Sequence, residues 1–259
     1  MSARQTKIAD FVCITKWRRN FARRSSGIDK KFGLRYNMRI FECVETLGME
    51  TDNISSAKIK VYISFDSVAD YGFMPEARRK EIYSVTDEKL AESKINTWNL
   101  LNFALSHGLN ANPCNVKFTR NEYGKWEANG FYFSLSHTDG AVAVAVSDFP
   151  CGVDVERISS FKQKCGNKKY ALSLAERIGE KYVDSNDLLK KWTGKESVYK
   201  AEGKGWFSPR KTRIENKNLY YASVGDYLVA AAISGSDFSA ELYLVTKEKA
   251  EKIKTYFTE

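Results

Sequence analysis

Two carboxylates, Asp154 and Glu156, stand two residues apart, each directly after a valine. Side chains alternate faces along a strand, so the valines point one way and the carboxylates the other, roughly 7 Å apart. Two like charges on one face are unfavourable unless a cation lies between them. Carboxylate oxygens suit Mg²⁺, whose ligand shell a substrate phosphate typically completes. The alternative is a solvated strand face, which the neighbouring apolar run 141–146 makes less attractive.

A second group of charged residues lies in the segment 192–200. If this segment is a helix, with about 100° between successive residues, five of its side chains fall within one arc of roughly 140°. These are Trp192, Lys195, Glu196, Tyr199 and Lys200. The charges would then lie on the same side as the aromatic rings, as in a cleft. The alternative is a surface ion pair between Glu196 and Lys200, worth only about 0.5 kcal/mol.

The segment Ser134-Leu-Ser136-His137 ends an alternating apolar stretch. Hydroxyls and an imidazole can bind phosphate, and the same residues could also form a turn. The other histidine, His107, is predicted at a helix C-terminus, where the helix dipole favours an imidazolium. We assign His107 no chemistry.

Strands and helices alternate along the chain around these groups. Alternating apolar residues predict a strand over 58–65, Pro75 predicts the start of a basic helix, and Thr86-Asp87 predicts the start of a helix ending at His107-Gly108. Helical periodicity covers 169–201, with a break near Asp184-Ser185. Further strands are predicted over 115–119, 131–135, 141–146, 153–156, 219–222, 227–233 and 241–245. The order predicts an α/β (α+β) body of about 200 residues, in two similar halves, 58–150 and 151–259.

Composition excludes several classes of protein. The chain has 259 residues, of which 43% are hydrophobic and 28% charged. Its longest apolar run, 140–146, is far shorter than the ~20 residues that span a bilayer, and no secretory signal is recognisable. The five cysteines are odd in number and lack a Cys-x-x-Cys spacing. We therefore expect neither a disulfide scaffold nor a zinc ribbon. A reducing compartment fits this cysteine content, so we expect the protein to be cytoplasmic.

The net charge of +9 lies in one segment. Residues 1–39 hold 11 of the 41 basic residues and two of the 32 acidic ones, so the remaining residues are neutral overall. We therefore expect a basic, poorly ordered extension over 1–57 and no nucleic-acid partner for the body. The alternative is that the extension, with its paired arginines beside Trp17 and Phe21, contacts RNA or an anionic membrane.

Taken together and in order, the motifs resemble those of the Sfp-type 4′-phosphopantetheinyl transferases. The family pattern is Gly-Lys-Pro, a Ser-His box, Gly-x-Asp-x-Glu, and Trp-x-x-Lys-Glu-x-x-x-Lys before Gly-Lys-Gly. The chain departs from it at Trp126, where the family usually has proline, and at Lys94, near where it commonly has arginine, whose bidentate fork a lysine lacks. The matching segments are Gly124-Lys125-Trp126, Phe133-Ser-Leu-Ser-His137, Gly152-Val-Asp154-Val-Glu156, Trp192-Thr-Gly-Lys195-Glu196 with Lys200, and Gly203-Lys204-Gly205.

The resemblance implies a fold, a reaction and partners. It implies a monomeric pseudo-dimer of two α/β halves with coenzyme A in the cleft between them. It implies transfer of 4′-phosphopantetheine from coenzyme A to a serine of an apo acyl or peptidyl carrier protein, with Mg²⁺ bound and 3′,5′-ADP released.

The resemblance also implies roles for particular residues. Glu196 would take the serine proton, either directly or through a metal-bound water, and Lys200 would stabilise the departing phosphate and could also protonate it. The implied Mg²⁺ ligands are Asp154, Glu156 and Glu196, and the implied contacts to coenzyme A are Lys125, Ser136, His137 and Lys195, with Arg78, Lys80 and Lys94 near the 3′-phosphate.

Two other functions are compatible with the same residues. Asp154, Glu156 and the Glu196/Lys200 pair could form the site of a Mg²⁺-dependent nuclease, although the neutral body counts against DNA binding. The chain could also be a non-catalytic protein that binds coenzyme A or a carrier. All three carboxylates are present, which favours an enzyme.

Overall fold

The structure is a computed structural model that describes residues 57–69, 73–203, 205–234, 238–247 and 249–253. The predicted basic extension lies outside these residues, except for Ala57. Residues Ser56–Glu259 form one compact unit, which contains all the predicted chemistry. Within the described residues, no helix has the length and apolar character needed to cross a membrane.

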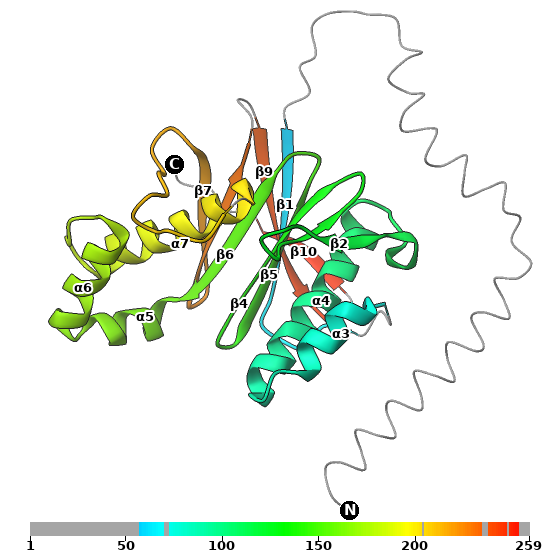
Figure 1. The fold of residues 1–259 in the computed structure, drawn as a ribbon, viewed down its shortest axis with the longest axis horizontal. Coiled ribbons are helices and arrows are strands. Elements are labelled where there is room, and N and C mark those ends of the chain that lie inside the picture. The colour runs from blue at the N-terminus through cyan, green and yellow to red at the C-terminus, as the bar shows by residue number, and fades with distance from the viewer. Residues whose placement is uncertain (1–56, 70–72, 204, 235–237, 248, 254–259) are drawn as a thin grey trace, which may run out of the picture. The chain divides into compact units, whose positions relative to one another are not determined.

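The larger sheet has five strands, in the order β10-β9-β1-β5-β4. β1 pairs antiparallel with β5 and parallel with β9, so the first described strand lies between strands from both halves of the chain. β9 and β10 therefore complete the sheet to which β1 belongs (Figure 1). The strands are β1 (Ala57–Ser64), β4 (Tyr132–Thr138), β5 (Ala141–Ser147), β9 (Phe238–Thr246) and β10 (Lys249–Ile253).

A second, antiparallel sheet has the order β6-β8-β7. Its strands are β6 (Cys151–Arg157), β7 (Asn218–Val224) and β8 (Tyr227–Ile233). A short hairpin of β2 (Phe118–Arg120) and β3 (Trp126–Ala128) precedes β4. The alternation that predicted a strand over 153–156 is confirmed by β6.

Five α-helices are described, with a 3₁₀ turn at Pro113–Asn115. Asp87 caps α4 and Asp184 caps α7 through their side chains, as the predicted helix start and helix break require. The apolar side chains of the C-terminal part of α4, such as Trp98 and Leu101, are buried, whereas those of its N-terminal part, Leu90 and Ile95, are exposed. The helices are α3 (Glu76–Tyr83), α4 (Glu88–Gly108), α5 (Ile158–Cys165), α6 (Lys168–Ile178) and α7 (Ser185–Glu202).

The elements stack in four layers. The two sheets pack face to face through a core of small and branched side chains that includes Val61, Ala143, Val153 and Ala231. α4 packs on the other face of the five-stranded sheet, around the fully buried Trp98. α7 packs on the other face of the three-stranded sheet (Figure 1). The mixed α/β class is thus confirmed, while the similarity of the two halves stays a prediction.

Serine hydroxyls join the two sheets beside the site. The backbone N–H groups of Val153 and Val155 on β6 donate to the Oγ atoms of Ser134 and Ser136 on β4, at 3.0 and 3.3 Å. These bonds replace a regular ladder between the two edge strands and satisfy N–H groups that would otherwise be buried without partners. They fix the position of the Ser-His segment against β6.

Candidate active site

Asp154 lies buried where β4, β6 and α7 meet. Its Oδ1 accepts hydrogen bonds from Ser136 Oγ at 2.8 Å and from Lys200 Nζ at 2.7 Å. Its Oδ2 is buried, with no hydrogen-bond partner among the described residues. A buried carboxylate oxygen without a partner is costly, so this atom is available for a further cation or donor.

Two further carboxylates, Glu156 on β6 and Glu196 on α7, are close enough to Asp154 to interact with its charge. Trp192 Nε1 on α7 donates to Glu156 Oε1 at 3.0 Å. Burial and then the charge of Asp154 raise the pKa of Glu156 above its usual range. Burial, together with the charges of Asp154 and Glu156, raises the pKa of Glu196 to about 7, although the Lys200 ammonium opposes the shift.

Glycine allows α7 to approach β6 closely enough to form this group. A Cβ atom on Gly152 would lie 1.9 Å from the carbonyl oxygen of Ser197 and 2.5 Å from the nitrogen of Ala201. No side chain fits there, so the Gly-x-Asp-x-Glu spacing has a packing reason as well as a chemical one. The two carboxylates of β6 face α7, and Val153 and Val155, which alternate with them, face the core, as the strand period predicts.

The carboxylates have the donor chemistry for Mg²⁺. Within the described part of the chain, no three His, Cys, Asp or Glu side chains are close enough to form a ready metal site. The Lys200 ammonium is instead the cation on Asp154. Burial and then the repulsion between the carboxylates raise the pKa values of Glu156 and Glu196; a hard divalent cation would offset that repulsion and could bind the partnerless Oδ2 of Asp154.

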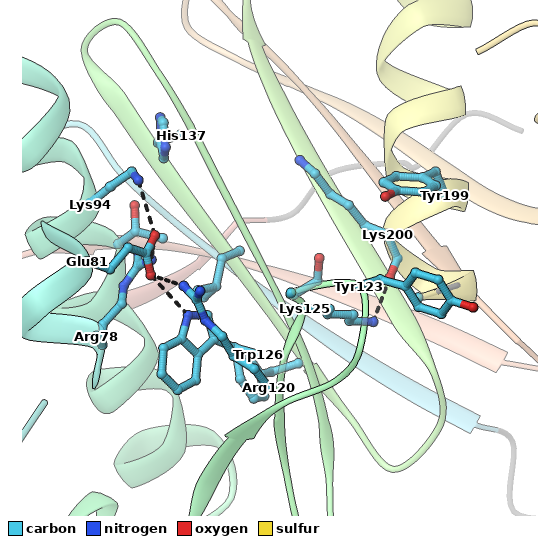
Figure 2. Close-up of a pocket in the computed structure, with 16 residues that line it drawn as sticks. Arg78, Glu81, Lys94, Arg120, Tyr123, Lys125, Trp126, His137, Tyr199 and Lys200 are labelled. Carbon is cyan, nitrogen blue, oxygen red and sulfur yellow. Dashed lines mark hydrogen bonds and ion pairs between the residues drawn. The ribbon is translucent and has the colours of Figure 1, made fainter. Parts of the chain in front are cut away.

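A cavity of about 350 Å³ opens beside this group (Figure 2). Lys200 lines it from α7, and Arg78 and Lys94 line it from α3 and α4. Five of its lining residues are lysine or arginine and one, Glu81, is acidic, so the cavity is strongly cationic. A small, basic cavity beside carboxylates is suited to a phosphate-bearing ligand.

His137 lies on β4 between these cations. Crowding by protein atoms, followed by the charges of Lys200, Lys94 and Arg78, holds the pKa of His137 below its usual range. The ring is therefore neutral near pH 7 unless an anion enters the cavity. A bound phosphate would favour its protonation, which would add one more charged hydrogen bond to the ligand.

The turn of the β2–β3 hairpin, residues 121–125, is hydrogen-bonded to the C-terminal end of α7. Lys125 Nζ donates to the carbonyl oxygen of Lys200 at 2.6 Å, and Asn121 Nδ2 donates to that of Gly203 at 3.0 Å. Gly203 ends α7 in the left-handed conformation, with φ of 63°. Burial holds the pKa of Lys125 below its usual range. Lys125 thus lines the cavity while fixing the wall that carries Lys200.

Other predicted residues lie elsewhere. Lys195 is only 2% exposed, and its ammonium contacts Glu180 Oε1 at 3.0 Å and the carbonyl oxygen of Thr212 at 2.8 Å. Lys80 pairs with Glu76 on the exposed side of α3. Neither lysine lines the cavity, so their predicted contacts to coenzyme A receive no support from the structure. Ser136 is behind the cavity wall, bonded to Asp154 and Lys200.

Two charged residues that line the cavity, Glu81 and Arg120, were not predicted as site residues. Glu81 and Arg120 are 39 positions apart and form an ion pair. No periodicity or short motif connects a helix residue to a hairpin residue at such a separation. The sequence did contain one indication of this cluster: Trp126, which replaces the proline usual in the family, contacts both Glu81 and Arg120.

Comparison with known proteins confirms the resemblance that the motifs indicate. No family model matches the chain. The chain is 35% identical over 107 residues to the 4′-phosphopantetheinyl transferase gsp of Aneurinibacillus migulanus, covering 40% of this chain and 45% of that protein. It is 30% identical over 125 residues to the 4′-phosphopantetheinyl transferase ffp of Bacillus subtilis, covering 42% and 51%. The matched region thus spans about half the length of these curated relatives.

Proposed function

We propose that this protein transfers 4′-phosphopantetheine from coenzyme A to a serine of an apo carrier protein. The observation that carries the proposal is the position of Lys200. Its ammonium lines the basic cavity and contacts the buried carboxylate of Asp154, so a phosphate ligand and the carboxylate group would meet at this residue. The names of both relatives support this class of enzyme.

The cavity offers the charges that coenzyme A requires. The pyrophosphate and the 3′-phosphate of coenzyme A are anionic, and the lysine and arginine side chains that line the cavity can neutralise them. Phosphoryl-type transfer depends mainly on positioning and charge neutralisation, which fits a site built from fixed lysines and arginines. The contacts that we assign to the ligand are those of Arg78, Lys94, Lys125, His137 and Lys200.

Asp154, Glu156 and Glu196 would hold Mg²⁺ against the pyrophosphate. The bound ion would neutralise charge on the phosphate oxygens. Lys200 would turn from Asp154 toward the leaving group, since its ammonium is within reach of both the carboxylate and the cavity. The hydroxyl of Ser136 would continue to donate to Oδ1 of Asp154 and so keep the carboxylate in place.

Glu196 would accept the proton of the carrier serine. The pKa of Glu196 is about 7 without the metal, and a cation beside the carboxylate would lower it, so Glu196 would be ionised at neutral pH and able to accept a proton. The serine oxygen bonds to the phosphorus that bears pantetheine, the bond from that phosphorus to the bridging oxygen breaks, and 3′,5′-ADP leaves with that oxygen. Lys200 stabilises the charge that develops on the leaving group.

The test is direct. The protein is incubated with coenzyme A, Mg²⁺ and a panel of apo fatty-acid, polyketide and peptide carriers, and each carrier is weighed. A carrier gains the mass of phosphopantetheine if the proposal holds. Asp154→Ala should nearly abolish the gain and Glu156→Ala should weaken it, while Glu202→Gln at an exposed position of α7 should not change it. No mass gain on any carrier, with coenzyme A binding absent, would refute the proposal.

The nuclease alternative is tested in parallel. Plasmid DNA incubated with the protein and Mg²⁺ should remain supercoiled, because the chain after residue 39 has equal numbers of basic and acidic residues and so no net positive charge to attract a duplex. Metal-dependent nicking that Asp154→Ala removes would support a nuclease instead. A protein that binds coenzyme A and a carrier without transferring the group would be the non-catalytic homologue.

A further inference from the structure

Glu81 on α3 holds three cations at the end of the cavity away from α7. Its carboxylate accepts from Arg78 Nη1 at 2.8 Å and from Lys94 Nζ at 3.2 Å. It also pairs with Arg120 on β2 and lies 3.4 Å from Trp126 Nε1 on β3. Figure 2 shows this carboxylate between the helices and the hairpin. One anion thus gathers cations from three separate elements.

Aromatic rings fix the planes of the two guanidinium groups. Arg120 lies over the ring of Trp126 at 4.7 Å, and Arg78 lies over the ring of Trp98 at 5.4 Å. The two indoles contact each other edge to face, with centroids 5.4 Å apart. Stacked guanidinium groups keep their N–H donors in a fixed plane, which suits the bidentate binding of a phosphate.

The buried guanidinium of Arg78 has a donor to spare. Its side chain is only 7% exposed, and its Nε is a buried atom without a hydrogen-bond partner among the described residues. Burial holds the pKa of Arg78 below its usual range, and the carboxylate of Glu81 opposes this shift. An unsatisfied buried donor on a cavity-lining arginine points to a ligand acceptor.

We infer that Glu81 is a positioning residue and that Arg120 is an additional phosphate-binding residue, which together select coenzyme A for its 3′-phosphate. The inference rests on the proposed function. The reaction end of the cavity is at Lys200 and Asp154, where the pyrophosphate would lie, so the third phosphate falls to the Glu81 end. Each of the three cations has more N–H donors than the one that it gives to Glu81.

The sign of the effect separates positioning from simple charge balance. If Glu81 only reduced the positive charge, Glu81→Gln would strengthen the binding of an anion. If Glu81 holds the cations in place, its loss leaves Arg78 as an unpaired buried charge, and the more exposed Lys94 and Arg120 move apart toward solvent. Phosphate binding would then weaken, because the ligand would have to order all three groups.

Calorimetry with coenzyme A and dephospho-coenzyme A, which lacks the 3′-phosphate, tests the inference. In the presence of Mg²⁺, Glu81→Gln and Arg120→Gln should each weaken coenzyme A binding about tenfold, the scale of one charge-assisted bond. Binding of dephospho-coenzyme A should change less than twofold. Glu76→Gln, at the exposed start of the same helix, is the matched control and should change neither.

Two further measurements guard against misfolding. Arg120→Gln alters a side chain that is 42% exposed, so a folded variant is expected even if Glu81→Gln unfolds. If Glu81 acts through Arg120, the double variant should lose little more affinity than the larger single loss. Unchanged or tighter coenzyme A binding by folded Glu81→Gln, or equal losses for both ligands, overturns the inference while transfer activity stands. Wild-type protein that binds no coenzyme A overturns the proposed function and this inference with it.

Discussion

Glu196 should make the stability of the metal-free protein fall as the pH rises. Its pKa is about 7 in the folded protein, against an ordinary 4.5. Between these values the native state holds a proton that the unfolded chain releases. The free energy of unfolding therefore decreases with pH over this window, by about 1.4 kcal/mol per pH unit for one such group.

The size of the effect follows from the width of the window. A shift from 4.5 to about 7 corresponds to about 3 kcal/mol, present below pH 4.5 and lost once the pH exceeds 7. Glu196→Gln removes the titration and keeps a side chain of similar shape. Relative to wild type, the variant should gain about 3 kcal/mol of unfolding free energy as the pH rises from 4.5 to 8.

Urea unfolding in EDTA at pH values from 4.5 to 8, followed by circular dichroism, measures this difference. Glu202→Gln, on the exposed side of α7, serves as the control and should follow wild type at every pH. Added Mg²⁺ should restore wild-type stability at pH 8 and leave Glu196→Gln nearly unchanged, because only an ionised carboxylate gains from the cation. Parallel pH profiles for wild type and Glu196→Gln in EDTA would show that Glu196 is solvated, and the argument for a crowded carboxylate group would fail.

Three other changes test separate parts of the structure. Lys200→Met keeps the packing of the stem but removes the charge, so coenzyme A should still bind with Mg²⁺ while single-turnover transfer slows about a hundredfold; normal turnover would contradict its role at the leaving group. Gly152→Ala places a Cβ atom 1.9 Å from a carbonyl oxygen of α7 and should cost about 3 kcal/mol of unfolding free energy, whereas an unchanged urea midpoint would show that the helix can move away. Deleting residues 1–55 should leave the circular dichroism spectrum and melting of the compact unit intact, and an insoluble product would show that the unit depends on them.

Local patterns predicted the parts of the site that lie within one element. The two-residue period of β6 correctly directed Asp154 and Glu156 away from the core, because β6 pairs with β8 in one unbroken register from Cys151 to Arg157. The helical arc grouped Glu196 with Lys200, and both charges act on Asp154 or on each other. These relationships depend only on backbone geometry, which sequence spacing determines.

Contacts between distant elements were beyond such patterns. The arc also included Lys195, but the structure buries its ammonium against Glu180 and the loop at Thr212. The Glu81 cluster depends on how α3 meets the hairpin, which no local spacing specifies. The pairing of β9 with β1 crosses the predicted boundary near residue 150, and no local spacing specifies such a pairing.

The central position of β1 has a consequence for how the chain is made. β1 lies between β5 and β9, and Ile59 pairs with Ala240, about 180 residues later in the chain. During synthesis, β1 through β5 emerge before β9, so one edge of β1 has no partner until β9 has also left the ribosome. Folding of the five-stranded sheet must then close this long loop, which is a slow step. A nascent chain that stops before β9 exposes an apolar strand edge, so truncation near the C-terminus should cause aggregation of the entire unit.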